Sequence, residues 1–438
     1  MRTSATLGST TVARSPSDVL TSRTLAPPVG TRDLLPPEAA DRRALTRALA
    51  ETLELHGYAL VTTPPFELAE TLERGLGGDP RETLRFVDPE TGEVSVFRPD
   101  LTVQVARLVA SGLRDRPPPH RLYYDGHVVR ARRGRARRQR QIAQIGAECL
   151  GVPGALGDAE VIALASRTLS RVGLVHTVEI AIVPMVRALC DRLPDELRSA
   201  ATIALARKDR LGIERALSAS DCDPAVRRAL VEVGTLTGGL EVLSRARPVL
   251  EAVARDHLVA LEALCVALDR RGLGSQVRLD LGEVRGFEYY TGPSFALLAD
   301  GPGEPLGGGG RYDDLLGRFG APMPASGFAI DLDHLTRAME LQARTVRANT
   351  RPRVCVVGAS DAELEVLRGR GIAAASVDGA SIESAIAYAE AWHLSAAVAL
   401  ADDTATIQWI GASREQCARA DVVHRLARAE RASAEDQT

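Results

Sequence analysis

Lysine is almost absent from this sequence: Lys208 is the only one, so nearly all of the positive charge is arginine. Excess charge of one sign is also lacking, because the formal net charge of −3 gives no general attraction to polyanions. The six cysteines form no C-x-x-C pair, which favours free thiols over a disulfide framework. The eight histidines show no H-x-x-x-H or H-E-x-x-H spacing, so no metal site is expected. No apolar run reaches roughly 18 residues, so no membrane span is expected.

The chain is nevertheless long enough for more than one core. Its 438 residues, 45% of them hydrophobic, suit two or three domains. Residues 1–26 are rich in Ser, Thr and Arg and poor in acids, and we expect a disordered N-terminal extension there. A transit peptide is the alternative, which the lack of a clear amphipathic face disfavours.

Hydrophobic periodicity divides the rest of the chain. Leu45, Leu49 and Leu53 recur at helical spacing, and Gly57 suits the C-cap of that helix. Short strands are expected over 94–98 and 121–129. We predict a core over 27–340 that includes a mostly helical insertion at 157–272, a linker over 341–352, a small α/β domain over 353–425, and a flexible tail over 426–438.

The most informative stretch is the strand-like run of residues 279–290, and strands are expected over 277–281 and 288–298. Its last six residues, from Arg285 to Tyr290, supply one guanidinium, one carboxylate and two phenols. A guanidinium binds carboxylates and a phenol hydrogen-bonds to a polar ring edge, so this set suits a zwitterionic ligand that carries a ring. The alternative is an ordinary strand with aromatic cross-strand pairs. Further on, residues 307–313 are expected to form a flexible turn into a helix, and 327–331 a small strand.

Several segments, in a fixed order, resemble histidyl-tRNA synthetases over about 27–340, with weaker similarity over 351–410. The resemblance implies an α+β fold with a class II aminoacyl-tRNA synthetase-like antiparallel sheet core, a helical insertion, and a small C-terminal α/β domain similar to a degenerate anticodon-binding domain. The segments that carry it are 30–36, 56–67 (motif 1), Arg98-Pro99-Asp100-Leu101-Thr102, 121–148 (motif 2), 285–292 (the histidine signature), 309–313 and 327–335 (motif 3).

The matched positions imply a pocket for histidine. Asp100 would pair with the ammonium group, Arg285 with the carboxylate, and Glu148 and Tyr290 with the two imidazole nitrogens. A site of this kind is selective because a wrong ligand leaves buried polar groups unpaired. The whole predicted histidine-binding set is Asp100, Thr102, Arg130, Gln144, Glu148, Arg285, Tyr289 and Tyr290.

The positions that class II synthetases use to bind ATP differ in this sequence. Arg130 keeps the motif 2 arginine, but the expected carboxylate two residues later is Arg132. In motif 3, His334 replaces the arginine and Asp331 replaces a glycine. Because phosphoryl-type chemistry depends on positioning and charge neutralisation, we expect no adenylate formation, no catalytic residues and no cofactor.

A synthetase-like core with a histidine pocket and an altered ATP site resembles the regulatory subunits of ATP phosphoribosyltransferase. This resemblance implies a cytoplasmic hetero-oligomer, in which a dimer of this subunit partners the short-form catalytic subunit and L-histidine is the effector. The arginine-rich run 130–140 contains no aromatic residues to stack bases, so tRNA is not an expected partner. A divergent histidine–tRNA ligase and a stand-alone histidine-binding dimer remain the alternatives.

Overall fold

A computed structural model describes residues 25–76, 83–131, 139–218, 221–285, 289–346, 352–377 and 381–435. Nearly all of the predicted N-terminal extension therefore lies outside the described residues. The chain divides into two compact units, one with residues up to 33 and 50–343, the other with 34–49 and 344–438. No helix among the described residues is both long and apolar enough to cross a membrane.

Helix α2 (Glu38–Leu55) begins in one unit and ends in the other. It carries the predicted Leu45, Leu49 and Leu53 stripe, and all three side chains are buried. Gly57 follows with a φ of 82°, the left-handed conformation in which glycine is favoured at helix ends. The structure thus confirms the helix predicted here.

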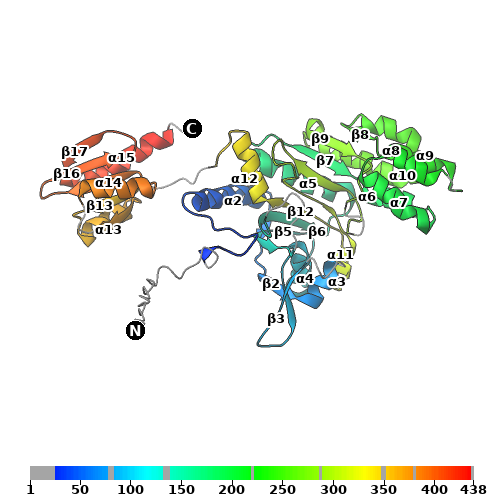
Figure 1. Cartoon of the computed structure of the whole chain (residues 1–438), viewed down its shortest axis with the longest axis horizontal. Coiled ribbons are helices and arrows are strands. Elements are labelled where there is room, and N and C mark those ends of the chain that lie inside the picture. Colours follow the sequence, from blue (N-terminus) through cyan, green and yellow to red (C-terminus); the bar gives the residue numbers. More distant parts are fainter. Residues whose placement is uncertain are drawn as a thin grey trace, which may run out of the picture. The chain divides into compact units, whose positions relative to one another are not determined.

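A large sheet forms the centre of the first unit (Figure 1) and contains nine strands within the described residues. Most neighbouring strands are antiparallel, as predicted, but the pairs β1–β5 and β7–β9 are parallel. In spatial order the strands are β1 (Ala59–Leu60), β5 (His120–Val129), β6 (Gln141–Leu150), β12 (Ala325–Asp331), β11 (Gly307–Arg311), β10 (Ser294–Leu298), β7 (Thr177–Ala181), β9 (Val277–Asp280) and β8 (Thr237–Gly238).

The two faces of this sheet differ because successive side chains of a strand point to opposite sides. Helix α5 (Gly154–Arg171) packs against β6 and β12 and covers the face that carries buried apolar residues such as Ile145 and Ile330. The opposite face carries small and polar residues together with buried apolar ones such as Val128, Ile142 and Leu150. One row across it joins Tyr124, Gly146, Ala329, Gly308, Ala296 and Glu179 in register.

Within the described residues, a smaller, three-stranded sheet is formed by residues between 66 and 97, and the loop that leads to Asp100 follows its strand β4 (Val94–Phe97). Its strands are β2 (Phe66–Leu68), β4 and β3 (Leu84–Val87), in that order. Helix α3 (Ala69–Leu76) packs beside β2 and β4 and against helix α4 (Thr102–Gly112). The predicted strand at 94–98 is therefore confirmed.

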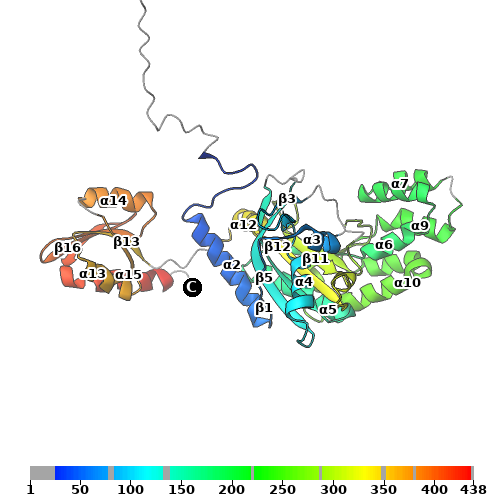
Figure 2. The ribbon, with the colours of Figure 1, turned by 90° about the horizontal axis from the view of Figure 1, so that it is seen from below.

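The helical insertion gathers at one end of the large sheet, beyond β7 and β9, in both views (Figures 1 and 2). Strand β7 lies within the stretch predicted as mostly helical, but it pairs with β10 and belongs to the sheet. The helices that follow it are α6 (Val183–Cys190), α7 (Asp195–Ala206), α8 (Arg210–Leu217), α9 (Pro224–Val233) and α10 (Val242–Asp269), and the short 3₁₀ turn Gly274–Gln276 leads into β9.

Two local predictions are wrong. The strand predicted over 277–281 is confirmed as β9, but the strand predicted over 288–298 begins only at Ser294, where β10 starts. Residues 307–311 are not a turn but strand β11, between β10 and β12. Its glycines are required by crowding, because a Cβ on Gly310 would lie 2.8 Å from the ring of Tyr290.

The rest of the first unit completes the core with helix α11 (Asp314–Gly317) and helix α12 (Leu332–Leu341), which follows β12 directly.

The second unit contains a five-stranded sheet within the described residues, with three parallel and two antiparallel strands. Its elements are β13 (Arg353–Val357), α13 (Asp361–Gly369), β14 (Ala373–Ser376), α14 (Ile382–Ala391), β15 (Ala396–Leu400), β16 (Thr404–Trp409), β17 (Arg414–Ala418) and α15 (Val422–Glu435). Most of the stretch predicted as a flexible tail is therefore helical.

Candidate functional site

The candidate site centres on the carboxylate of Glu148, which is fully buried in β6. Three hydroxyl groups donate to it: Thr102 Oγ1 at 2.7 Å, Tyr124 OH at 3.2 Å, and the phenol of Tyr312. On the neighbouring strand it faces Gly327, where a Cβ would collide with the carboxylate. Among the described residues, no arginine, lysine or histidine side chain hydrogen-bonds to Glu148.

The lack of a cationic neighbour has an electrostatic consequence. Burial in a low-dielectric interior disfavours the charged form of a carboxyl group. Burial raises the pKa of Glu148 to about 8, although the hydroxyl donors of Tyr312 and Thr102 act in the opposite direction. The site therefore has unused capacity to bind a positively charged or proton-donating group.

Arg98 positions the segment that delivers Asp100 and Thr102. Its guanidinium is buried and donates to the carbonyl oxygens of His127 (2.7 Å) and Thr63 (2.9 Å). A Cβ on Gly126 would lie 2.5 Å from this guanidinium, so β5 needs glycine there. The arginine of the Arg-Pro-Asp-x-Thr segment thus has a structural role, and the acid and hydroxyl that follow it face the site.

Asp100 combines a structural contact with a place in the site. Its Oδ1 accepts from the backbone N–H groups of Thr102 (2.7 Å) and Val103 (3.3 Å), at the start of α4. Within the described part of the chain, nothing hydrogen-bonds to Oδ2. The negative charge of Asp100 also acts on the site, because it contributes to raising the pKa of Glu148 and of Tyr290.

Tyr289 and Tyr290 form an aromatic wall beside Glu148. Their ring centroids are 5.2 Å apart in an edge-to-face arrangement, and Tyr289 lies 5.3 Å from the ring of Tyr312. Burial, followed by the charges of Asp100 and Glu148, raises the pKa of Tyr290 to about 12. Tyr290 is therefore a neutral phenol that can donate one hydrogen bond.

Gln144 and Arg130 lie further along the same hairpin. Gln144 is two pleats from Glu148 on the same side of β6, opposite Gly126 on β5 and Asp331 on β12. Arg130 is exposed just beyond the end of β5, where its N–H donates to the carbonyl oxygen of Arg140 at 2.9 Å.

Arg285 lies in a different charged neighbourhood from Glu148. Its guanidinium donates to the Glu283 carboxylate at 2.5 and 2.8 Å, and 68% of its side chain is exposed. After the Glu283 contacts and burial, the charges of Glu179 and Asp280 also act on its pKa, which is raised. The structure thus brings Asp100, Thr102, Glu148, Tyr289 and Tyr290 together and leaves Arg285 paired with Glu283.

The end of β12 corresponds to the predicted ATP side. Asp331 Oδ1 accepts from the N–H groups of Asp333 (2.9 Å) and His334 (3.1 Å) and so caps α12. The Nδ1 atom of His334 lies 3.0 Å from the carbonyl oxygen of Pro305. Arg132, the other altered position, lies outside the described residues.

Two residues of this site were absent from the predicted set. Tyr312 and Tyr124 both donate to Glu148, and both are buried. Tyr312 belongs to the matched segment Gly-Gly-Arg-Tyr-Asp, so the sequence did contain a signal for this residue. Tyr124 lies in the motif 2 segment, but only the register of β5 and β6 shows that it is this tyrosine that lies near Glu148.

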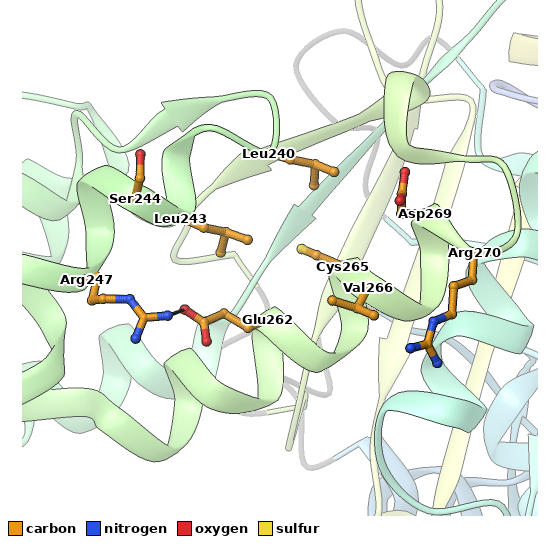
Figure 3. Close-up of a pocket in the computed structure, with 9 residues that line it drawn as sticks. All are labelled: Leu240, Leu243, Ser244, Arg247, Glu262, Cys265, Val266, Asp269 and Arg270. Atoms are coloured by element: carbon orange, nitrogen blue, oxygen red, sulfur yellow. Dashed lines mark hydrogen bonds and ion pairs between the residues drawn. The ribbon is translucent and has the colours of Figure 1, made fainter.

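A separate pocket lies in the helical insertion (Figure 3). Helix α10 contains a break at Ala254, where φ is −148°. As a result, Arg247 and Glu262, fifteen positions apart, form an ion pair at 2.5 Å beside Leu243 and Val266. This pocket shares no residue with the Glu148 site.

Comparison with known proteins places these features in a family. A model of the histidyl-tRNA synthetase family matches residues 30–335. An ATP phosphoribosyltransferase regulatory subunit from Anaeromyxobacter dehalogenans (strain 2CP-C) is 42% identical over 348 residues, which are 75% of this chain and 99% of the relative. The chain belongs to the histidyl-tRNA synthetase-like family of ATP phosphoribosyltransferase regulatory subunits. A relative of the same name from Moorella thermoacetica is 39% identical and covers 71% of this chain and 81% of its own.

A solved structure supports the same family assignment. This chain is similar to the crystal structure of an ATP phosphoribosyltransferase regulatory subunit/histidyl-tRNA synthetase from Bacillus halodurans C, with 28% sequence identity and a TM-score of 0.74. The match covers 84% of this chain and 97% of that protein. The predicted class II synthetase-like fold, with its additional C-terminal sheet domain, is thereby confirmed for this member of the regulatory-subunit family.

Proposed function

We propose that this chain is a non-catalytic regulatory subunit of ATP phosphoribosyltransferase that binds L-histidine in the Glu148 site. In this proposal it is needed for the activity of a short-form catalytic subunit and transmits feedback inhibition by histidine in the first step of L-histidine biosynthesis. The observation that carries the proposal is the contrast between the two ends of one sheet face. Glu148 is assembled for a ligand, whereas Asp331 is used to cap α12.

The Glu148 site supplies suitable partners for histidine. The carboxyl groups of Asp100 and Glu148 and the phenol of Tyr290 are close enough to influence one another electrostatically. An ammonium group suits Asp100, and an imidazole suits a neutral phenol on one side and a carboxyl on the other. In the proposal, Thr102, Tyr289 and Gln144 line the site, while Arg130 and Arg285 serve the ligand carboxylate once Arg285 leaves Glu283.

The ATP side argues against adenylate formation. A triphosphate needs cations, but the end of β12 presents the buried carboxylate of Asp331, with His334 near it at 3.8 Å. His334 also has the carboxylate of Glu304 at 3.7 Å. A phosphate placed here would meet two acids, so we infer that histidine binds without being consumed.

Titration calorimetry with L-histidine, with and without ATP, tests this proposal directly. We expect histidine binding, no binding of ATP, and no release of pyrophosphate. A purified short-form catalytic subunit should gain activity on addition of this chain and lose it again when histidine is added. Failure of histidine to bind, or of the catalytic subunit to respond, would contradict the proposal.

A divergent histidine–tRNA ligase is the second candidate. It is favoured by the match to the synthetase family and by the double name of the Bacillus halodurans protein. It is disfavoured in the second unit, where α14 carries two exposed acids, Glu383 and Glu390, and no basic residue. A phosphate backbone would find no partner on this helix. Histidine-dependent pyrophosphate release together with charging of tRNA would establish the ligase.

The remaining parts of the proposal concern assembly and location. We place the protein in the cytoplasm, in a hetero-oligomer in which it also self-associates as a dimer. The segment that matches motif 1 exposes Leu60 and Phe66, and the next residue after it, Leu68, is exposed as well, which suits a surface covered by a second copy. Measuring the mass of the isolated chain by light scattering separates a dimer from a monomer.

A further inference from the structure

The only lysine of the chain occupies a strained position in the turn between α7 and α8. Lys208 has a φ of 53°, in the left-handed region that L-residues with a Cβ seldom adopt. The turn is held by Asp209 N–H to Ala204 O at 2.9 Å and by Asp209 Oδ1, which caps α8 by accepting from Gly212 N–H at 2.8 Å. Glycine is the usual residue at such a position, so the lysine is retained there at a conformational cost.

The contact that Lys208 makes links two parts of the first unit. Its Nζ lies 2.6 Å from Oδ1 of Asp280, the last residue of β9, and Asp280 is only 8% exposed. The same oxygen accepts from the N–H of Gly282 at 3.1 Å, where the loop to Arg285 begins. One carboxylate oxygen therefore joins the helical insertion to the base of the loop that carries Arg285.

Lys208 and Arg285 belong to one cluster of charges. Glu179, half-buried on β7, interacts electrostatically with Asp280, Arg285, Glu283 and Lys208. Among the described residues, Lys208 and Arg285 are the only cations that form ion pairs with the acids of this cluster, Glu179, Asp280 and Glu283. In the structure, Arg285 neutralises Glu283 at 2.5 Å while Lys208 neutralises Asp280.

We infer that the cluster formed by Glu179, Lys208, Asp280, Glu283 and Arg285 couples occupancy of the histidine site to the helical insertion. The inference rests on the proposed function, because it requires the ligand carboxylate to draw Arg285 away from Glu283. Lys208 is then the remaining cation for three acids, and its attraction to the end of β9 increases. Helices α7 and α8 are held more firmly on the sheet as a result, and Lys208 acts as a coupling residue without touching the ligand.

Hydrogen–deuterium exchange measured with and without saturating L-histidine tests the coupling. In the full-length wild-type chain, we expect exchange in residues 195–217 to slow about fivefold on addition of histidine, the lower end of ordinary allosteric coupling. Lys208→Met should still bind histidine by calorimetry but lose this slowing, and Lys208→Arg should restore much of it. A purely structural role for Lys208 would change exchange in these helices equally with and without ligand.

Arg247→Met is the matched control, because it removes an ion pair of the same insertion, with Glu262 at 2.5 Å, that does not reach the sheet. We expect it to keep the histidine-dependent slowing. The inference alone is overturned if histidine slows exchange equally in Lys208→Met and in wild type. It is also overturned if histidine binds to wild type but does not slow exchange there. Absence of histidine binding in calorimetry instead overturns the proposed function.

The single lysine also provides a spectroscopic readout in the wild-type chain. Reductive methylation with ¹³C-formaldehyde keeps the positive charge and labels only Lys208 and the N-terminal amine. Lys208→Met, if it folds, assigns the lysine signal; otherwise the pH titration of the two amines does so. The lysine methyl signal should shift when histidine is added, and an unchanged signal in the bound protein would contradict the coupling.

Discussion

Glu148 and Asp331 are buried carboxylates on the neighbouring strands β6 and β12, yet their surroundings are opposite in kind. Glu148 accepts from hydroxyl groups of Thr102, Tyr124 and Tyr312, which come from three distant segments. Asp331 accepts from the N–H groups of Asp333 and His334, in the first turn of the helix that follows it. The first arrangement exists only in the folded sheet, whereas the second is local.

We interpret this difference as the one between a carboxylate suited to binding a ligand and a structural carboxylate. One oxygen of Asp331 already accepts from two backbone N–H groups, and Nδ1 of His334 lies 3.8 Å from the other oxygen, so a ligand would have to compete for this carboxylate. A carboxylate surrounded by neutral hydroxyls, without a cation, stays available for a cationic group. The sequence alone does not tell a carboxylate suited to binding from one that caps a helix. Variants of Glu148 and Asp331 therefore test this difference most directly.

The largest expected effect is on histidine affinity when the charge of Glu148 is removed. Glu148→Gln keeps the size of the side chain but removes its charge, and its single amide oxygen can accept from only some of the three hydroxyl groups. We expect histidine to bind about 100-fold more weakly, which corresponds to roughly 3 kcal/mol and is typical of a buried charged pair. Calorimetry measures the change, and Asp331→Asn, as the control, should stay within about threefold of wild type.

The buried Glu148 should also make the stability of the ligand-free protein depend on pH. Its pKa is raised from 4.5 to about 8 on folding, so the folded state holds a proton that the unfolded state releases. The stabilisation is complete below about pH 4.5 and is lost as the pH rises through about 8. Between these values the free energy of unfolding should fall by at most about 1.4 kcal/mol per pH unit.

The measurement is the difference in unfolding free energy between wild type and Glu148→Gln, by denaturant titration from pH 5.5 to 8.5. Burial lowers the pKa of His120, His176 and His257, and these groups contribute the opposite slope in both proteins. The difference between the two proteins removes their contribution. Parallel curves for wild type and variant would show that Glu148 is ionised in the empty site.

A smaller effect is expected from one hydroxyl donor. Tyr312→Phe removes a hydrogen bond to Glu148 and should weaken histidine binding about tenfold, the effect of losing one hydrogen bond to a charged group. Tyr123→Phe is the matched control, since its phenol lies on the other side of β5 and donates to Glu54 at 2.5 Å. Equal loss of affinity in the two variants would mean that general destabilisation, and not the site, is responsible.

The sequence predicted the order of the main elements and five of the residues that come together in the candidate site: Asp100, Thr102, Glu148, Tyr289 and Tyr290. Asp100 and Thr102 are neighbours in one motif, as are Tyr289 and Tyr290, so their proximity followed from the chain itself. The leucine stripe of α2 and the position of β5 were also readable, the stripe because burial on a helix follows its periodicity. Each of these predictions depended on residues that are close in sequence.

The errors arose where distant contacts override local preference. Four successive glycines favour a turn, yet Gly307–Arg311 is a central strand. The reason is that Cβ atoms there would meet the backbone of β12 and the ring of Tyr290. The aromatic stretch before β10 favours a strand, yet it leaves the sheet and packs Tyr289 against Tyr312. The local sequence of β11 does not reveal its contacts with β12 and Tyr290, and the local sequence around Tyr289 does not reveal its contact with Tyr312.

The smallest expected effect concerns the structural carboxylate and measures stability only. Asp331→Ala removes the cap of α12 and should lower the free energy of unfolding by about 1 kcal/mol, as is usual for an N-cap acid, while Asp331→Asn should be nearly neutral because asparagine caps equally well. Denaturant titration gives both values. The contrast with Glu148 then becomes quantitative: Asp331→Ala should change stability with little change in histidine affinity. A large loss of affinity in Asp331→Ala would place the end of β12 within the ligand site and remove the distinction between the two carboxylates.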